Sequence, residues 1–292
     1  MARLISLSEL IDRVWEQYRA SLLSFLSISG WVLVPGLLYV IALAFYPTVD
    51  TIILSDSLTN SQSVGVVLFA VTRNVVAPIL AFWVFLACVH FGSDQLERGR
   101  ADVRTAMAEG WKRFLPALGA TALFVVLLFA SFFLTMGPGF LLSILTSSTK
   151  TGWVVGIRNI LMVAGVVGAA YFSIRWFLEY QFAPLIAALG DKKPLDAFKT
   201  SAGLLKGRFW AVAVRSVVPK IVFVLLGGAG LWALSTVSSV GLSMLSGFGL
   251  PFVARLGSFM SILFSWVLYP MFILPLVYLC DVHLYRSLKE RV

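Results

Sequence analysis

The chain has 292 residues, of which 59% are hydrophobic and 13% are charged, and its formal net charge is +9. Soluble domains are about 45–50% apolar, so this composition excludes an ordinary soluble globular protein. The positive charge invites a comparison with nucleic-acid-binding proteins, but no RNA- or DNA-binding motif accompanies it. Nucleic acid is therefore not expected as a partner.

Transmembrane helices are predicted at six long apolar runs. Each run is close to the ~20 residues that cross the hydrocarbon core of a bilayer. In lipid such runs must be helical, because the backbone finds no water to bind. The runs span residues 22–45, 75–91, 115–136, 160–177, 217–237 and 256–280. Short outer loops are expected at residues 50–63, 137–152 and 238–251.

An amphipathic segment precedes each pair of apolar runs. In residues 6–21, Ser6 and Glu9 form a capping-box pattern, and apolar residues recur at helical spacing. Residues 102–113 precede the second pair of apolar runs in the same way, and residues 196–210 precede the third pair. Such segments are typical of helices that lie in the membrane interface. The fold class predicted is an all-α polytopic membrane protein with six transmembrane helices.

The order of these elements also predicts an internal repeat. Three parallel α-hairpin repeats, each preceded by a cytoplasmic amphipathic helix, would occupy residues 1–92, 93–189 and 190–292. Together they form one predicted membrane domain, residues 1–292. Most of the 23 Lys and Arg residues lie near the termini and within residues 93–113 and 190–220. Because basic residues mark cytoplasmic loops, both termini are predicted to be cytoplasmic.

Three arginines open the second apolar run of each predicted repeat: Arg73, Arg158 and Arg255. A guanidinium group suits bidentate contact with phosphate. If the repeats surround a common axis, these groups would form a ring that binds an anionic lipid or a diester. The simpler alternative is that each arginine reaches outer-leaflet phosphates and ends its helix.

A second group of polar candidates lies toward the cytoplasmic side. Arg175 and Glu179 are four residues apart and share one face of the predicted fourth helix. A structural ion pair and a proton or ion relay are both compatible with this intramembrane polar pair. The residues predicted at the cytoplasmic interface are Lys206, Arg208, Arg215 and Lys220.

Metal binding and catalysis are not expected. Zinc uses Cys and His ligands, and Cys88, His90, Cys280 and His283 fall near the ends of two predicted helices. However, Cys88 and His90 are two residues apart and would point to nearly opposite faces of a helix. No nucleotide-binding loop, H-E-x-x-H motif or Ser/His/Asp set is present, so no cofactor and no enzymatic activity are expected.

A family resemblance appears between Tyr180 and Trp210. The residues that carry it are Phe182-Ala183-Pro184-Leu185, Pro194-Leu195-Asp196-Ala197-Phe198, Ser201, Leu204, Lys206-Gly207 and Trp210. This stretch resembles the six-helix membrane-domain family of glycerophosphoryl diester phosphodiesterases and of related stand-alone bacterial inner-membrane proteins. The resemblance implies a multi-pass protein of the prokaryotic plasma (inner) membrane, in a largely uncharacterised family with a connection to lipids. The sequence has no phosphodiesterase barrel, so hydrolysis is not implied.

The leading functional hypothesis is a non-enzymatic integral membrane protein that binds or organises anionic lipid or a lipid-derived headgroup. One alternative is a small transporter or permease with a polar site between the repeats. Prolines in the predicted helices favour that alternative, because they free backbone carbonyls that transporters use to bind ions. Another is a scaffold subunit of a membrane complex. The expected partners are membrane lipids, with a membrane-protein partner or a second copy of the chain as further candidates.

Overall fold

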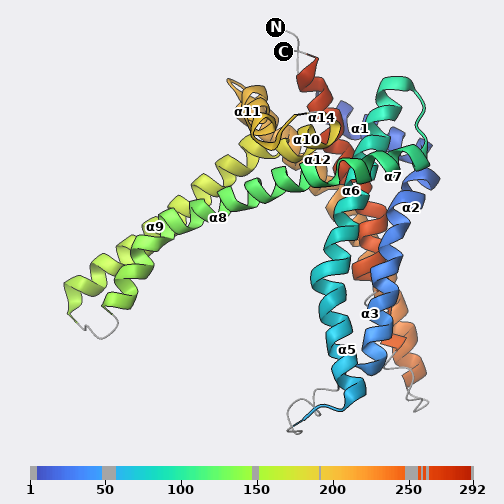
Figure 1. Cartoon of the computed structure of the whole chain (residues 1–292), viewed down its shortest axis with the longest axis horizontal. Helices are drawn as coiled ribbons and strands as arrows, with labels where there is room; N and C mark the ends of the chain where they lie inside the picture. The colour runs from blue at the N-terminus through green and yellow to red at the C-terminus, as the bar shows by residue number, and fades with distance from the viewer. Residues whose placement is uncertain are drawn as a thin grey trace. The chain divides into compact units, whose positions relative to one another are not determined.

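The structure is a computed structural model that describes residues 5–47, 57–146, 151–190, 192–246, 256–257, 259–260 and 263–290. Within these residues the secondary structure is helical (Figure 1). Six helical stretches of the described chain are long and apolar enough to cross a membrane. The prediction of an all-α, multi-pass membrane protein is confirmed. The spans are Leu22–Phe45, Asn60–Arg98, Phe114–Leu145, Gly152–Leu189, Phe209–Met244 and Leu263–Lys289.

Most helices extend further than the apolar runs suggested. The loop predicted at residues 137–152 is wrong in its first half, because α8 (Phe114–Leu145) continues through Pro138. The loop predicted at residues 238–251 likewise begins later, since α12 (Phe209–Ser246) ends at Ser246. In lipid a helix that continues satisfies its own backbone groups, whereas a loop does not. This preference outweighs the weak helix propensity of Gly, Ser and Pro.

The helices belong to two compact units, Met1–Phe114 with Arg215–Arg291, and Leu115–Val214. The described helices of the first unit, besides most of α12, are α1 (Leu7–Ala20), α2 (Leu22–Ser29), η1 (Gly30–Val32), α3 (Leu33–Phe45), α5 (Asn60–Val71), η2 (Thr72–Val76), α6 (Ala77–Arg98), α7 (Val103–Lys112), η3 (Leu263–Leu268) and α14 (Tyr269–Lys289). Those of the second unit, besides α8, are α9 (Gly152–Tyr180), α10 (Ala183–Leu189) and α11 (Pro194–Leu205).

Helix α1 confirms the first amphipathic segment. The hydroxyl of Ser6 accepts a hydrogen bond from the backbone N–H of Glu9 at 3.2 Å and caps the helix. Leu10, Val14 and Tyr18 are buried along one face, and that face packs against α14. These side chains join the hydrophobic core of the first unit, so α1 is fixed to the transmembrane helices by burial of its apolar face.

Helix α7 confirms the second amphipathic segment. The carboxylate of Asp102 caps its N-terminus by accepting hydrogen bonds from the backbone N–H and the hydroxyl of Thr105, both at 2.8 Å. These bonds hold the pKa of Asp102 below its usual range. Gly110 lets α7 approach the backbone of α6, where a Cβ would lie 3.0 Å from the Ala87 nitrogen.

Two spans contain a π-helical segment that ends just before a proline. Segment η2 ends two residues before Pro78, and η3 ends two residues before Pro270. A proline lacks an N–H, and its ring clashes with the carbonyl four residues earlier. A local π adjustment keeps such a helix continuous in lipid. Pro138, Pro219 and Pro275 lie inside α-helices without such a segment, so a π adjustment is one of several ways in which this chain accommodates a proline.

In the second unit, α8 and α9 pack in opposite directions. The rings of Phe124 and Phe177 lie 5.8 Å apart at one end of the pair. Gly165 faces the backbone of α8 further along, where a Cβ would lie 2.7 Å from the carbonyl oxygen of Thr135. Close approach at small residues is the usual way in which helices associate in membranes.

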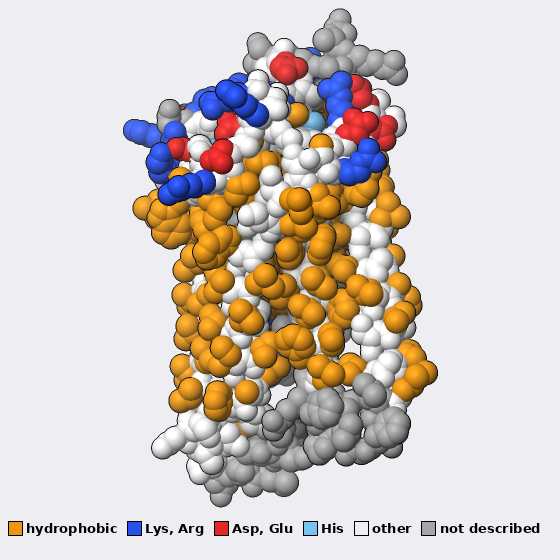
Figure 2. Space-filling model, turned by 90° about the vertical axis from the view of Figure 1, so that its right-hand side faces the viewer, with side chains coloured by type: hydrophobic (Ala, Val, Ile, Leu, Met, Phe, Trp, Pro, Cys, Tyr) orange, Lys and Arg blue, Asp and Glu red, His pale blue; other side chains and the backbone are white. Residues whose placement is uncertain are grey.

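Charged side chains gather at one end of the face that Figure 2 shows, and hydrophobic side chains cover the long stretch beside them. This separation is what a bilayer requires, because charged side chains remain near water while apolar side chains contact acyl chains.

Candidate functional site

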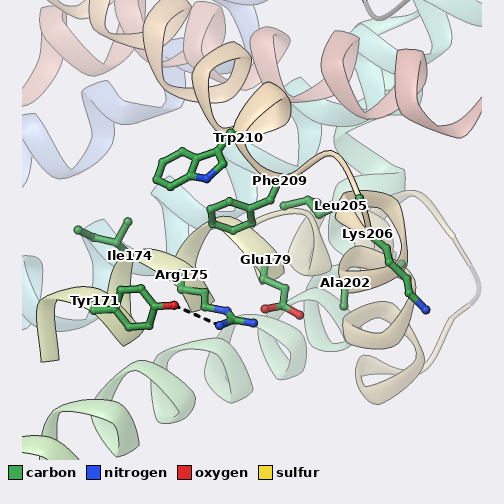
Figure 3. A pocket seen from close by; sticks show the side chains of 11 residues that line it. Tyr171, Ile174, Arg175, Glu179, Ala202, Leu205, Lys206, Phe209 and Trp210 are labelled. Atoms are coloured by element: carbon green, nitrogen blue, oxygen red, sulfur yellow. Dashed lines mark hydrogen bonds between the residues drawn. The ribbon is translucent and has the colours of Figure 1, made fainter. Parts of the chain in front are cut away.

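A groove of about 770 Å³ lies in the second unit, between α9, α11 and the first turn of α12. Its polar lining includes Arg175, Glu179 and Lys206. The first two are the predicted intramembrane polar pair, and Lys206 is one of the predicted cytoplasmic-interface residues. Its remaining walls are largely aromatic and aliphatic (Figure 3). We call it the α9–α11 pocket. Its size is within the range of ordinary ligand sites.

The two walls of the pocket are joined by contacts between α9 and α11. The buried hydroxyl of Ser201 donates a hydrogen bond to the backbone carbonyl of Glu179 at 2.7 Å. Beside it, the rings of Tyr180 and Phe198 lie 5.0 Å apart. Glu179 is held in place through its backbone, which leaves its carboxylate directed into the pocket.

A tight turn forms the rim of the pocket between α11 and α12. Lys206 has φ −57° and ψ 122°, and Gly207 has φ 75°. The N–H of Arg208 donates to the carbonyl of Leu205 at 2.9 Å. This is a type II turn, whose third position needs a positive φ and therefore favours glycine. The predicted amphipathic segment 196–210 is thus α11 followed by a turn, and α12 begins at Phe209.

Arg175 and Glu179 lie next to each other on the floor of the pocket (Figure 3). The guanidinium of Arg175 donates a hydrogen bond to the hydroxyl of Tyr171 at 3.3 Å. Arg175 therefore bonds to Tyr171, one turn before it on α9, and not to the carboxylate of Glu179, one turn after it. Arg175 is exposed and Glu179 is half-buried, so both charges are accessible to a ligand.

Aromatic side chains face these charges. Phe209 and Trp210 lie across the pocket from Arg175 and Glu179, and Lys206 lies at its far edge (Figure 3). The Trp210 side chain is 75% exposed. No site role was predicted from the sequence for Tyr171, Phe209 or the Trp210 ring. The signals in the sequence were the spacing of Tyr171 to Arg175 and the aromatic pair directly after the turn.

The other predicted interface residues do not line this pocket. The guanidinium of Arg215 donates through Nε to the carbonyl of Ile5 at 2.7 Å, which ties the start of the chain to α12. Lys220 forms an ion pair with Asp281 of α14 at 2.6 Å. Arg208 is half-buried and contributes its backbone to the turn. Arg215 and Lys220 therefore hold the first unit together.

The outer arginines lie in separate parts of the chain. Arg73 is exposed on η2 in the first unit, and Arg158 is half-buried near the start of α9 in the second unit. Arg255 lies outside the described residues. A common ring of these three arginines remains a prediction.

A polar cluster that the sequence did not indicate joins α1 to α6 and α14. The amide nitrogen of Gln17 donates to the carbonyl of Gly92 and to the side chain of Gln95, both at 3.0 Å. The amide oxygen of Gln17 lies 2.6 Å from Nε2 of His283. The amide nitrogen of Gln95 in turn donates to the hydroxyl of Ser21 at 2.5 Å. This Gln17 cluster fixes one end of the first unit.

Three of the four side chains considered as zinc ligands are buried or hydrogen-bonded within the protein. Cys88 and Cys280 are free and buried, and His283 is bonded to Gln17. Within the described part of the chain, no group of three or more His, Cys, Asp and Glu side chains is arranged to hold a metal ion.

Comparisons of the chain with protein-family models, with curated proteins and with solved structures find no match.

Proposed function

We propose that this chain is a non-enzymatic membrane protein that binds the phosphate-bearing headgroup of a membrane lipid in the α9–α11 pocket. The single observation that carries the proposal is that an arginine and a lysine line one groove with aromatic walls, at the end of a membrane span. Guanidinium groups bind phosphate with two parallel hydrogen bonds. Aromatic side chains suit the headgroup level of a bilayer, where one end is apolar and the other is wet.

In this proposal the pocket opens at the cytoplasmic side of a prokaryotic plasma (inner) membrane. Basic residues around α11, including Lys192, Lys193 and Lys199, are exposed, and such residues favour the cytoplasmic side. Their charge also attracts anionic headgroups, at roughly 1 kcal/mol per residue near the surface. The outer arginines Arg73, Arg158 and Arg255 would contact phosphates of the other leaflet. Membership of the resembled family is part of the same proposal.

The three predicted repeats also belong to the proposal. They are supported by the order of the described elements, in which a short helix precedes two long ones in each third of the chain: α1, then α7, then α11. Repeats that start on the same side of the membrane would place all three short helices at the cytoplasmic interface.

The test is the amount of phospholipid that stays with the purified protein. Arg175→Gln removes the charge and keeps a polar side chain of similar size. Because hydrogen bonds to charged groups contribute about 1.5–3 kcal/mol, we expect Arg175→Gln to lower phospholipid affinity by roughly tenfold or more. The measurement is mass spectrometry of bound lipid after prolonged washing in a mild detergent. Lys206→Gln should have a smaller effect, because Lys206 is exposed at the rim.

Arg208→Gln is the matched control, since Arg208 lies nearby in the chain and does not line the pocket. Its bound lipid should fall much less than that of Arg175→Gln, because only the general attraction of a basic residue near the surface is lost. Equal lipid content in wild type and Arg175→Gln would disprove the proposed site. A triple variant with Gln at positions 73, 158 and 255 tests the outer arginines separately, and unchanged lipid content there would remove them from the proposal.

A further inference from the structure

The α9–α11 pocket contains a negative charge as well as positive ones. Glu179 lines it beside Arg175. A site for phosphate alone would be weakened by a carboxylate, because the two anions repel each other. The guanidinium of Arg175 takes the hydroxyl of Tyr171 as its partner, so the carboxylate is not used to neutralise it by a direct bond. Arg175 lies near Glu179 without a direct bond to it, so a ligand with a positive group would give Glu179 a counter-charge in direct contact.

The aromatic wall also suits a positive group. Phe209 and Trp210 lie across the pocket from Glu179 (Figure 3), and their rings lie 5.4 Å apart. An ammonium group over the face of an aromatic ring is attracted by the ring quadrupole, most strongly by tryptophan. The two rings are nearly perpendicular, at 86°, so one ring can present its face to the pocket while the other meets it by an edge. A carboxylate opposite such an aromatic pair is a suitable environment for an ammonium group.

The spacing of the two charges sets the size of the headgroup. Arg175 and Glu179 are four residues apart on α9, so their Cβ atoms are about 5–6 Å apart. A phosphate and an ammonium joined by a two-carbon bridge can reach both side chains at once. A headgroup with a single charge can use only one of them.

A second, shallow groove continues from the pocket along the exposed face of α9, and all its lining residues belong to that helix. It has a volume of about 800 Å³, and Tyr171 lines both grooves. Its lining includes Ile160, Val163 and Val167, which are 69%, 65% and 63% exposed. The groove reaches from Tyr171 to Asn159, which is about 18 Å along a helix. One leaflet of a hydrocarbon core of about 30 Å is about 15 Å deep, so an acyl chain that starts beside Tyr171 would end within this groove, before it reaches Asn159.

We propose that the occupant is a zwitterionic phospholipid whose headgroup ends in an ammonium group. Its phosphate binds Arg175, its ammonium binds Glu179 beneath Phe209 and Trp210, and one acyl chain lies in the groove along α9. This inference rests on the proposed function, because it assigns the chemistry of the lipid that occupies the same pocket.

The experiment compares phosphatidylethanolamine with phosphatidylglycerol of identical acyl chains. Both lipids carry the phosphate, and only the first carries an ammonium. Affinities are measured by native mass spectrometry of protein delipidated in detergent and titrated with each lipid. We expect the wild type to prefer phosphatidylethanolamine. Glu179→Gln should lower the affinity for that lipid by roughly tenfold, the loss of one charge-assisted contact. The same variant should bind phosphatidylglycerol as well as the wild type does, or better.

Two further variants control the interpretation. Glu179→Asp keeps the charge and should keep the preference, which shows that the position tolerates substitution. Glu16→Gln changes an exposed glutamate of α1 outside the pocket and should change neither affinity. Arg175→Gln should weaken both lipids, because both carry the phosphate.

The outcomes separate this inference from the proposed function. If Glu179→Gln leaves the preference unchanged while Arg175→Gln weakens both lipids, the ammonium contact is wrong and lipid binding stands. If Arg175→Gln weakens neither lipid, both proposals fail. Glycerophosphoethanolamine, which is the headgroup without chains, should not displace the lipid at equal concentration. Full displacement at that concentration would overturn the acyl-chain groove.

Discussion

The side chain of Gln17 uses both its donors and its acceptor at the junction of α1, α6 and α14. Because its nitrogen donates to Gly92 and Gln95, its oxygen must accept from His283, and this assigns the proton of the imidazole to Nε2. Next to it, the hydroxyl of Tyr18 donates to the carbonyl of Phe272 at 3.0 Å. Burial raises the pKa of Tyr18 to about 12, so this hydroxyl remains a donor at physiological pH.

Replacing Gln17 tests how far a single residue holds α1 in place. Gln17→Ala removes three contacts and leaves partly buried polar groups on α6 and α14 unpaired, which costs about 1–3 kcal/mol for each such group. We expect a loss of at least about 2 kcal/mol in the free energy of unfolding, measured by denaturant titration in mixed micelles. Glu16→Ala changes the exposed neighbour and should alter stability by less than about 0.5 kcal/mol. Equal losses for the two variants would contradict the role assigned to Gln17.

In helix α14, a backbone carbonyl that a proline leaves without its usual donor is hydrogen-bonded by a neighbouring helix. Pro275 cannot donate to the carbonyl of Met271 four residues earlier. The hydroxyl of Ser29 lies 2.8 Å from that carbonyl and 2.7 Å from the carbonyl of Phe25, so its single hydrogen is shared between them. The carbonyl of Met271, which Pro275 frees, is thus bound by another helix. It is not open to an ion, which removes one reason for the transporter alternative.

A double-mutant cycle tests this pairing of proline and serine. Ser29→Ala should lower the free energy of unfolding by about 1–2 kcal/mol, because the Met271 carbonyl is left without a donor. In a Pro275→Ala background the new N–H at position 275 supplies that donor, so the same change should cost less than half as much. Unfolding in mixed micelles measures all four proteins. Effects that add to within about 0.5 kcal/mol would show that the two residues act independently.

At the scale of the whole molecule, the orientation of the chain in the membrane can be tested. It is defined by the six spans and by the side of the membrane on which the two termini lie. The Gln17 cluster holds α1 beside the last turns of α14, so both ends of the chain's helical part lie at one end of the first unit. The two native cysteines are buried, which leaves a low background for labelling. Glu16 and Ser57 are exposed, lie outside the six spans and flank the first span, Leu22–Phe45, on opposite sides.

Labelling with a membrane-impermeant maleimide checks the orientation. In spheroplasts we expect Ser57→Cys to react and Glu16→Cys to react only after the membrane is permeabilised, because the termini are predicted to be cytoplasmic. The wild type should remain unlabelled in both conditions. The reverse pattern would overturn the predicted orientation. It would also move the α9–α11 pocket to the other leaflet.

Local patterns in the sequence predicted the secondary structure of this protein well. The six spans follow from apolar length alone, because lipid leaves a long apolar segment no alternative to a helix. Ser6 and Asp102 mark the starts of α1 and α7, since a side-chain cap depends only on residues three apart. The ends of α8 and α12 were predicted less well, because Gly, Ser and Pro resemble loop residues even where a helix continues.

The candidate site was predicted only in part. Arg175, Glu179 and Lys206 were singled out by charge in an apolar context, which is a local signal. That these three share one groove depends on the Ser201 contact between α11 and α9 and on the turn at Gly207. Sequence therefore determined the number of spans, the starts of α1 and α7 and the charged candidates. Only the tertiary structure decided which candidates meet and which partners complete the Gln17 cluster, because such contacts join residues that are distant along the chain.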